Sequence, residues 1–132
     1  MYALDTNTIA YFFKGMGGVA ERLAVVPPSQ IEVSAVVAYE LAVGVARSPE
    51  ASRRREQLAR FLSVIQVVPF GPHEADAAAR IRADLEQRGL PIGPLDVLIA
   101  GAALARGAVL VTRNMREFSR VVGLSVENWY AE

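Results

Sequence analysis

Short apolar runs rich in β-branched residues alternate along this chain with longer segments whose apolar residues recur every three or four positions. The short runs are typical of buried strands, and the longer segments are typical of helices with one buried face. Strands are expected at Tyr2–Leu4, Ile31–Ser34, 65–69, 108–111 and 124–126. Helices are expected at 8–13, Val19–Val25 and 35–46, from Pro49 onward, and at 72–88, 95–106 and 115–119.

Capping and breaking residues mark the ends of several of these helices. Ser34 is a suitable N-cap for the helix at 35–46, and the run Ser48-Pro49-Glu50 supplies a cap, a proline at the first helical position and an acid facing the helix dipole. Gly89 and Gly107 follow the last periodic positions of two later helices. A glycine there can adopt the left-handed backbone that ends a helix, so both helices are expected to stop at these residues.

The alternation of strands and helices predicts the fold class. Parallel strands joined by helices are covered on both faces, so the chain is expected to form a three-layer α/β/α sandwich with a central parallel sheet. The run at 108–111 is almost entirely apolar, as expected for a strand buried on both faces. Hydrophobic residues make up 52% of the 132 residues, and neither repeats nor linkers divide them. A single domain over 1–132 is therefore expected.

Composition excludes several kinds of site. The chain has no cysteine and a single histidine, His73. Disulfide scaffolds, thiolate zinc sites, iron–sulfur clusters, cysteine nucleophiles and multi-histidine metal sites are thereby excluded. His73 lies beside Glu74, outside every motif described below, and is expected on the surface. The 14 basic and 14 acidic residues give zero net charge, so binding of nucleic acid by bulk electrostatics alone is not expected.

The chain shows no sign of export or membrane insertion. Its N-terminus lacks a basic region followed by an apolar one. The longest apolar stretch, 97–105, is far shorter than the roughly 20 residues that a spanning helix needs. A cytoplasmic location without membrane contact is the expectation.

Acidic and amide side chains fall where the predicted strands end. Asp5 follows the first strand, Asn114 follows the fourth, and Glu117 lies one helical turn further. Asp96 lies in the first turn of its helix, and Glu40 lies in a helix among apolar neighbours. Because ligands of open parallel sheets bind beyond the carboxyl ends of the strands, these side chains are expected to converge at one edge.

Two interpretations of these acids stay open from the residues alone. Asp5 and Asp96 can be simple N-caps, and Glu40 can be an ion-paired helix residue. Alternatively they bind a cation, since burying a lone carboxylate costs several kcal/mol unless it is paired or holds a metal. Carboxylates without histidine or thiolate select Mg²⁺ or Mn²⁺, which suits phosphodiester hydrolysis. Asp76 and Asp84, by contrast, have arginines nearby on one long helix and are expected to form solvated ion pairs.

Four segments occur in the order and at the spacing of the motifs of a known family. They are 4–8, 33–41, 91–100 and 111–118, and the segment 123–129 fits the same branch. On these motifs the chain resembles a PIN-domain ribonuclease of the VapC toxin type, over nearly its whole length. The first motif alone is weak, but four in order are specific.

The resemblance implies a role for each motif residue. It implies metal binding by Asp5, Asp96 and Glu40, with Glu40 as the catalytic glutamate. Many relatives have aspartate where this chain has Asn114, so Glu117 is expected to supply the fourth charge and Asn114 a neutral hydrogen bond.

Four further residues are expected to orient the site or bind substrate. Asn7 matches a position that orients the site by hydrogen bonding. Thr112 either bonds a ligand carboxylate or is a satisfied hydroxyl at a strand end. Arg113 and Arg116 flank the fourth motif and are expected to contact phosphate. The arginine run at 53–55 has the same possible role, although exposed helix arginines are more often only solvated.

The function that the resemblance implies is a Mg²⁺-dependent endoribonuclease, with Mn²⁺ as a possible substitute. Such a protein is the toxin of a toxin–antitoxin pair and cuts cellular RNA, often tRNA or ribosomal RNA, which stops translation. The resemblance also implies a homodimer and a cognate VapB-type antitoxin. That antitoxin is expected to wrap an apolar groove and to place a basic side chain in the acidic site.

Other functions are weighed against this one. A phospho-receiver domain is also α/β with acids at strand ends, but it needs a lysine after its last sheet strand, and Lys14 is the only lysine here. A catalytically silent PIN-like module that binds RNA or protein is the better alternative, although it has no use for a carboxylate cluster. Trp129 and Phe118 are expected to pack against the sheet rather than stack on bases.

Overall fold

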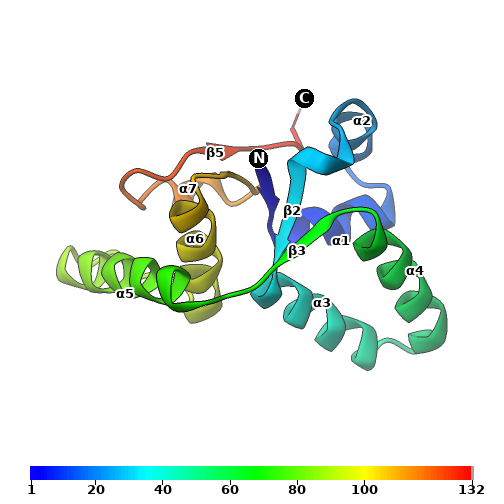
Figure 1. Ribbon diagram of the computed structural model, residues 1–132, viewed down its shortest axis with the longest axis horizontal. Helices are drawn as coiled ribbons and strands as arrows, with labels where there is room; N and C mark the ends of the chain where they lie inside the picture. The colour runs from blue at the N-terminus through cyan, green and yellow to red at the C-terminus, as the bar shows by residue number, and fades with distance from the viewer. Residues whose placement is uncertain (132) are drawn as a thin grey trace.

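A computed structural model describes residues 1–131, which form a five-stranded sheet (Figure 1). The strands are β1 (Tyr2–Leu4), β2 (Ile31–Ser34), β3 (Gln66–Val68), β4 (Val109–Val111) and β5 (Val126–Glu127). They lie in the order β3-β2-β1-β4-β5, and each neighbouring pair is parallel. The parallel sheet predicted from the alternating pattern is confirmed.

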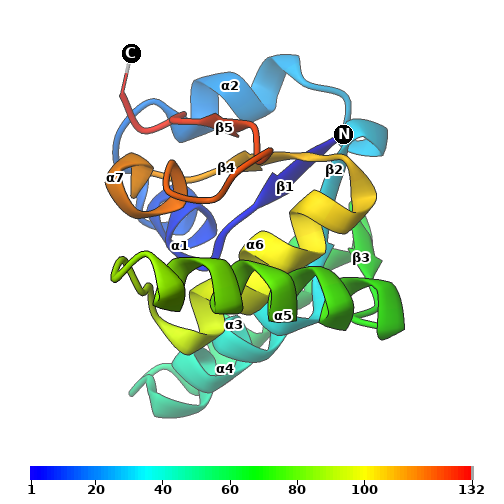
Figure 2. The same cartoon turned by 90° about the vertical axis from the view of Figure 1, so that its left-hand side faces the viewer.

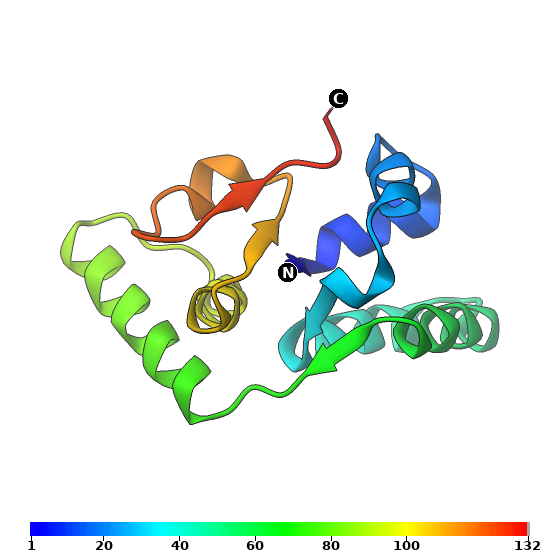
Figure 3. The ribbon, with the colours of Figure 1, turned by 45° about the horizontal axis from the view of Figure 1, so that its top comes forward.

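Helices cover both faces of this sheet. They are α1 (Thr6–Lys14), α2 (Val19–Val25), α3 (Ala35–Arg47), α4 (Ala51–Ser63), α5 (Pro72–Gln87), α6 (Pro94–Arg106) and α7 (Met115–Phe118), and a 3₁₀ turn, η1 (Pro28–Gln30), precedes β2. Right-handed crossovers place α1 to α4 on one face and α5 to α7 on the other, as Figures 2 and 3 show. The predicted three-layer sandwich is confirmed. Within the described residues, none of the helices is long and apolar enough to cross a membrane.

The chain changes direction across the sheet at β1. From β1 it proceeds outward through β2 and β3, and after α5 and α6 it returns to the other side of β1 as β4 and β5. Such a reversal leaves a crevice at the carboxyl ends of the strands that flank it. The segments that follow β1, β2 and β4 therefore begin side by side at one edge of the sheet.

The aromatic residues near the C-terminus belong to the core. Trp129 and Phe118 are fully buried. The Trp129 ring lies 5.2 Å from the ring of Tyr2, and its Nε1–H donates a hydrogen bond to Oε1 of Glu127 at 3.0 Å. The prediction that these two side chains pack inside is confirmed, so neither of them is available to stack on a base.

A close contact between two helices fixes the position of α6. A Cβ atom on Gly101 would lie 2.6 to 2.7 Å from the Cβ, Cα and N atoms of Ala78 on α5. Because only a glycine leaves room for this approach, α5 and α6 pack nearly backbone to backbone. The N-terminal end of α6, which carries Asp96, is thereby held against the edge of the sheet.

The helix after Ser48 begins later than predicted. Its first residue is Ala51 rather than Pro49, and Ser48 is the C-cap of α3. The Ser48 hydroxyl does accept a backbone hydrogen bond, from Glu50 N–H at 3.1 Å, but this bond closes a turn between two helices. The predicted roles of Ser48 as N-cap and of Pro49 as first helical residue are therefore wrong, because Glu50 is the N-cap of α4.

The boundaries of the last strand and of the first helix also differ from the prediction. The last strand is Val126–Glu127 instead of 124–126, because Leu124 N–H bonds to Val121 in the preceding turn while Val126 is the residue paired with Leu110. The first helix begins at Thr6 instead of residue 8, since the residue before it acts as its cap.

Candidate active site

Asp5 follows β1 directly and is the N-cap of α1. Its Oδ1 accepts a hydrogen bond from Thr8 N–H at 2.8 Å, and its own N–H donates to the Val111 carbonyl at 3.1 Å. The carboxylate is buried, yet Oδ2 makes no hydrogen bond within residues 1–131. Asp5 can therefore be both an N-cap and a metal ligand, because Oδ1 caps the helix and Oδ2 is left for another partner.

Glu40 reaches the same edge from α3. Thr6 Oγ1, on the first residue of α1, donates to Glu40 Oε1 at 2.5 Å. This bond joins two helices that pack on the same face of the sheet and holds the glutamate beside the first turn of α1. No ion pair within the described part of the chain involves Glu40, so it is not the ion-paired helix residue that was one of its possible interpretations.

The pKa of Asp96 is raised by burial and by the other acids of the site. It lies in the first turn of α6, where its Oδ2 folds back to 3.4 Å from the position that a Cβ on Gly93 would occupy. Burial, followed by the charges of Glu117, Glu40 and Asp5, raises the pKa of Asp96 to about 6. The charges of these three carboxylates disfavour the ionised form of Asp96, so all three lie near enough to Asp96 to affect its ionisation.

Asn114 and Thr112 shape the turn that carries the fourth motif. Thr112 is fully buried, and its Oγ1 accepts a hydrogen bond from Asn114 N–H at 3.0 Å. Asn114 in turn caps α7, with Oδ1 accepting from Glu117 N–H at 3.4 Å. Of the two alternatives for Thr112, the structure supports the satisfied hydroxyl at a strand end, which positions Asn114 and Glu117.

A cavity of about 310 Å³ opens beside Asp5, and Asn7, Tyr11, Arg113 and Asn114 line the rest of it. Asn7 is exposed on its wall and makes no side-chain hydrogen bond to another described residue. Its predicted role of orienting the site by hydrogen bonding therefore has no bond to support it here. The cavity places amide and basic groups next to the acids.

The oxygen donors of these side chains suit a hard cation, but the number of protein ligands that one ion can have is limited. Within residues 1–131, no three acidic or histidine side chains are grouped so that they hold one metal ion together. The three-ligand set implied by the resemblance is therefore not assembled. Mg²⁺, however, is usually bound by one or two carboxylates while waters complete its shell. A cation would also relieve the repulsion that raises the pKa of Asp96, so the residues fit such an ion.

Some predicted residues lie away from this cluster or are already paired. In the run at 53–55, Arg53 pairs with Glu50 at 3.2 Å and Arg54 donates to Gln57 at 3.1 Å. Arg116 is exposed on α7, next in the chain to Glu117. The structure thus leaves the phosphate role of Arg116 a prediction and gives Arg53 and Arg54 partners of their own.

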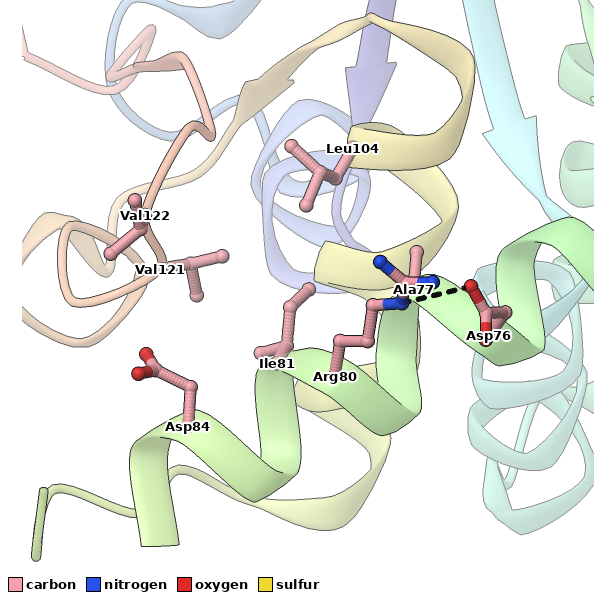
Figure 4. A pocket seen from close by; sticks show the side chains of 8 residues that line it. All are labelled: Asp76, Ala77, Arg80, Ile81, Asp84, Leu104, Val121 and Val122. Carbon is pink, nitrogen blue, oxygen red and sulfur yellow. Dashed lines mark ion pairs between the residues drawn. The ribbon is translucent and has the colours of Figure 1, made fainter. Parts of the chain in front are cut away.

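The acids of α5 form the surface ion pairs expected of them. Asp76 bonds to Arg80 at 3.1 Å and Asp84 to Arg88 at 2.6 Å, all with well-exposed side chains. Asp76 and Asp84 rim a hollow of about 530 Å³ between α5, α6 and the segment after α7, with Val122 on its far side (Figure 4). This hollow contains none of the four clustered acids. His73 is exposed at the start of α5, as predicted.

Sequence reasoning does not find two tyrosines at the site. Tyr11 lines the cavity and lies four residues after Asn7 on α1, so helical spacing from the first motif was a signal for it. Tyr130 lies close to Tyr11, with ring centroids 4.9 Å apart. It follows the last strand, and no spacing in the sequence points to it.

Comparison with known proteins places this geometry in a family. The model of the PIN domain matches residues 2–124. The chain belongs to the PIN domain family. The predicted resemblance is thereby confirmed, and the PIN domain accounts for the parallel sheet.

Relatives of this PIN protein are named as ribonucleases. It is 34% identical over 128 residues to the tRNA(fMet)-specific endonuclease VapC of Salmonella typhimurium, which covers 97% of both chains. It is 36% identical over 131 residues to ribonuclease VapC2 of Rickettsia felis, covering 98% of both. The PIN fold also superposes on the crystal structure of Rickettsia felis VapBC2 bound to a promoter DNA fragment, with a TM-score of 0.91, 35% identity and coverage of 97% and 98%.

Proposed function

We propose that this protein is a Mg²⁺-dependent endoribonuclease and the toxin of a toxin–antitoxin pair. The observation that carries the proposal is that the charges of Glu117, Glu40 and Asp5 act on Asp96 and help to raise its pKa. Structural caps and surface ion pairs do not gather four acids at the switch point of a parallel sheet. The relatives named as VapC ribonucleases support the same activity, and the tRNA named for one of them supports tRNA as a substrate class.

Each residue has a distinct part in the proposed reaction. Asp5 and Asp96 would hold the cation through the oxygens that the fold leaves without protein partners. Glu40, which accepts a hydrogen bond from the Thr6 hydroxyl, would accept a proton from the water that attacks the RNA phosphorus. Glu117 adds negative charge, and Asn114 keeps Glu117 in place through the α7 cap.

The cation, when bound, supplies a water of lowered pKa and neutralises charge on the phosphate. In the proposed hydrolysis a water oxygen would form a bond to phosphorus and pass its proton to Glu40, and the bond from phosphorus to one ribose oxygen would break as that oxygen takes up a proton from solvent. The protein's own contribution is to keep these acidic side chains close together at the edge of the sheet. Mn²⁺ fits the same oxygen donors and is expected to support the reaction.

Induced expression tests this function directly. Wild type is expected to arrest growth and to leave discrete RNA fragments. Asp5→Asn and Asp96→Asn are expected to do neither, because each removes one charge from the cation site. Asp76→Asn is the matched control, since it makes the same change at an exposed aspartate whose partner is Arg80. All variants are compared at equal levels of folded protein.

Two results would contradict the proposal. If wild type and both site variants behave alike, either the acids are structural or the protein is a silent PIN-like module, whose RNA or protein partner is then sought by co-purification. If purified wild type cleaves RNA equally with excess EDTA, the reaction does not use a divalent cation.

We also propose a VapB-type antitoxin as the partner, bound in a groove that starts at the acidic site. A groove of about 370 Å³ between α1, α3 and α4 begins at Thr6 and Glu40 and continues over the apolar side chains of Phe13, Leu41 and Val45. Several related structures are VapBC complexes, including those of Rickettsia felis and Salmonella typhimurium. An extended or helical segment with apolar anchors and one basic residue suits this surface. The homodimer stays a prediction.

Gly44 offers a selective way to block this groove. It lines the groove on α3, one turn from Glu40, and a Cβ there would meet nothing within 4 Å. Gly44→Leu is expected to weaken antitoxin binding by roughly 10-fold or more, because the added side chain occupies the groove. Gly44→Ala, which removes only helix-breaking flexibility, is expected to leave binding nearly unchanged. Calorimetric titration with the antitoxin checks both, and equal affinities would contradict the assignment of the groove.

A further inference from the structure

Three side chains beside the acidic cavity form one stack. The Arg113 guanidinium carbon lies 3.7 Å from the ring centroid of Tyr130 and 5.5 Å from that of Tyr11. The two rings meet edge to face. The three residues come from the turn after β4, the C-terminal segment and α1, and together they are called the Arg113 stack below. Such contacts hold an arginine without consuming its N–H donors.

The backbone fixes the ring on which Arg113 lies. Gly17 adopts a left-handed φ of +68°, and a Cβ there would come within 2.6 Å of the Tyr130 ring. Gly18 N–H donates to the Tyr130 carbonyl at 3.0 Å, and Tyr130 N–H donates to Asn128 Oδ1 at 2.9 Å. The loop between α1 and α2 therefore seats the ring closely, and only glycine allows this approach.

Arg113 differs from most other arginines of the chain in how it is held. Within residues 1–131 its guanidinium forms neither a hydrogen bond nor an ion pair, whereas Arg22, Arg80 and Arg88 each bond to a nearby acid. One face lies on Tyr130, so the N–H donors at its edge remain available. The same guanidinium lines the 310 Å³ cavity on whose wall Asp5 lies. A fixed cation with free donors thus stands beside the acids without pairing to them.

We infer that the Arg113 stack is the subsite for an RNA phosphate next to the bond that is cleaved. The inference rests on the proposed function and adds to it the residues that place the substrate. A guanidinium with free, coplanar donors matches the geometry of a phosphate. A phosphodiester drawn to the acids carries negative charge, and Arg113 supplies the nearby positive charge that this acidic site itself lacks. Arg113 contacts the substrate, and Tyr130 and Tyr11 are positioning residues.

Steady-state cleavage of a fluorescein-labelled single-stranded oligoribonucleotide tests this assignment. Arg113→Gln is expected to raise KM about 10-fold and to change kcat less than about threefold, because one charged hydrogen-bonding contact made in both ground and transition state is lost. Tyr130→Leu is expected to raise KM similarly, and Tyr130→Phe, which keeps the ring, is expected to behave as wild type. Arg80→Gln is the matched control for charge, since Arg80 lies on α5 and pairs with Asp76.

Salt dependence separates a phosphate contact from a merely structural role. Binding of the same oligoribonucleotide is measured in the Asp96→Asn background across a series of salt concentrations. Arg113→Gln is expected to reduce the slope of log affinity against log salt by about 0.7, the value for one phosphate contact on a single strand. Tyr130→Leu, which keeps the charge, is expected to lower affinity while changing the slope less.

The outcomes distinguish this inference from the function on which it rests. If wild type cleaves RNA and Arg113→Gln shows unchanged KM and an unchanged salt slope, the inference is wrong and the function stands. If Tyr130→Phe loses as much as Tyr130→Leu, with equal melting temperatures, the ring is not what positions Arg113. If wild type neither cleaves nor binds the oligoribonucleotide, the proposed function fails and the subsite with it.

Discussion

Replacing Asp96 with asparagine is expected to abolish RNA cleavage and, at the same time, to make the protein more stable above pH 6. Cleavage is expected to fall about 100-fold or more, because a charged group at the cation site is lost. Stability is expected to rise because burial and the charges of Glu117, Glu40 and Asp5 hold the pKa of Asp96 at about 6, above the ordinary 3.8. Opposite effects on activity and stability mark a site whose charge serves function.

The sign of the pH dependence follows from that raised pKa. An unfolded chain releases the Asp96 proton near pH 4, but the folded protein keeps it until about pH 6. Between these values the folded state binds more protons, so wild-type stability falls as the pH rises from 4 to 6 and stays lower above that range. Asparagine does not ionise, so the variant does not show this fall. The two proteins are expected to differ little at pH 4 and most at pH 7 to 8.

The size of this difference follows from the rise in the pKa of Asp96 from 3.8 to about 6, an effect that solvent partly screens. Such a rise in pKa corresponds to roughly 3 kcal/mol at full burial. Asp96 is half-buried, so screening reduces the expected gain to about 1 to 2 kcal/mol, or roughly 3 to 8 °C in Tm for a domain of this size. Thermal melts in EDTA at a series of pH values measure it, with Asp76→Asn as the control that should gain nothing. An equal gain at pH 4 and pH 8 would contradict the electrostatic origin.

A divalent cation is expected to stabilise the wild-type protein, because it would offset the repulsion among the acids that destabilises the protein above pH 6. Added Mg²⁺ is expected to bind the folded wild type and to raise its Tm at pH 8, with a gain that grows with the Mg²⁺ concentration. In Asp96→Asn, which lacks one of the proposed ligands, that gain is expected to shrink. A gain of equal size in both proteins would show that the cation binds elsewhere.

Most of the site could be predicted because strand order alone determines which side chains meet. Asp5 and Asn114 follow β1 and β4, which pair directly, so placing both at one edge required only the parallel sheet. Glu40 and Asp96 lie on helices whose starts were indicated by Ser34 and Gly93. The family resemblance then assigned roles that spacing alone had left open.

The features that could not be predicted depend on contacts between segments far apart in the chain. The turn after α3 and the start of α4 share one set of capping residues, and the sequence does not show which of the two Ser48 closes. Tyr130 reaches Arg113 only because the loop at Gly17 accepts its ring. Glu32 lies in the predicted strand Ile31–Ser34, but nothing in the sequence indicates that its side chain is buried.

Arg106→Met is expected to remove about 3 to 5 kcal/mol from the free energy of unfolding, the second large effect. Glu32 is almost completely buried in β2, and its Oε2 accepts a hydrogen bond from Arg106 Nε at 2.7 Å. Its other oxygen, Oε1, is buried and has no partner within the described residues. Methionine at 106 would leave Glu32 as a buried charge without a counter-charge, and breaking a buried pair in this way costs far more than the pair contributes.

A double-mutant cycle tests this prediction, because Arg106 and Glu32 differ in how deeply their side chains are buried. The Arg106 side chain is 31% exposed and that of Glu32 only 2%, so Glu32→Met leaves a cation that can reach water and is expected to cost less. The double variant Glu32→Met with Arg106→Met is expected to recover most of the loss, since well-packed apolar residues replace a buried ion pair at little cost. Urea denaturation measures all four proteins. A loss below about 1 kcal/mol in Arg106→Met, or strictly additive effects, would show that the pair behaves as a surface ion pair.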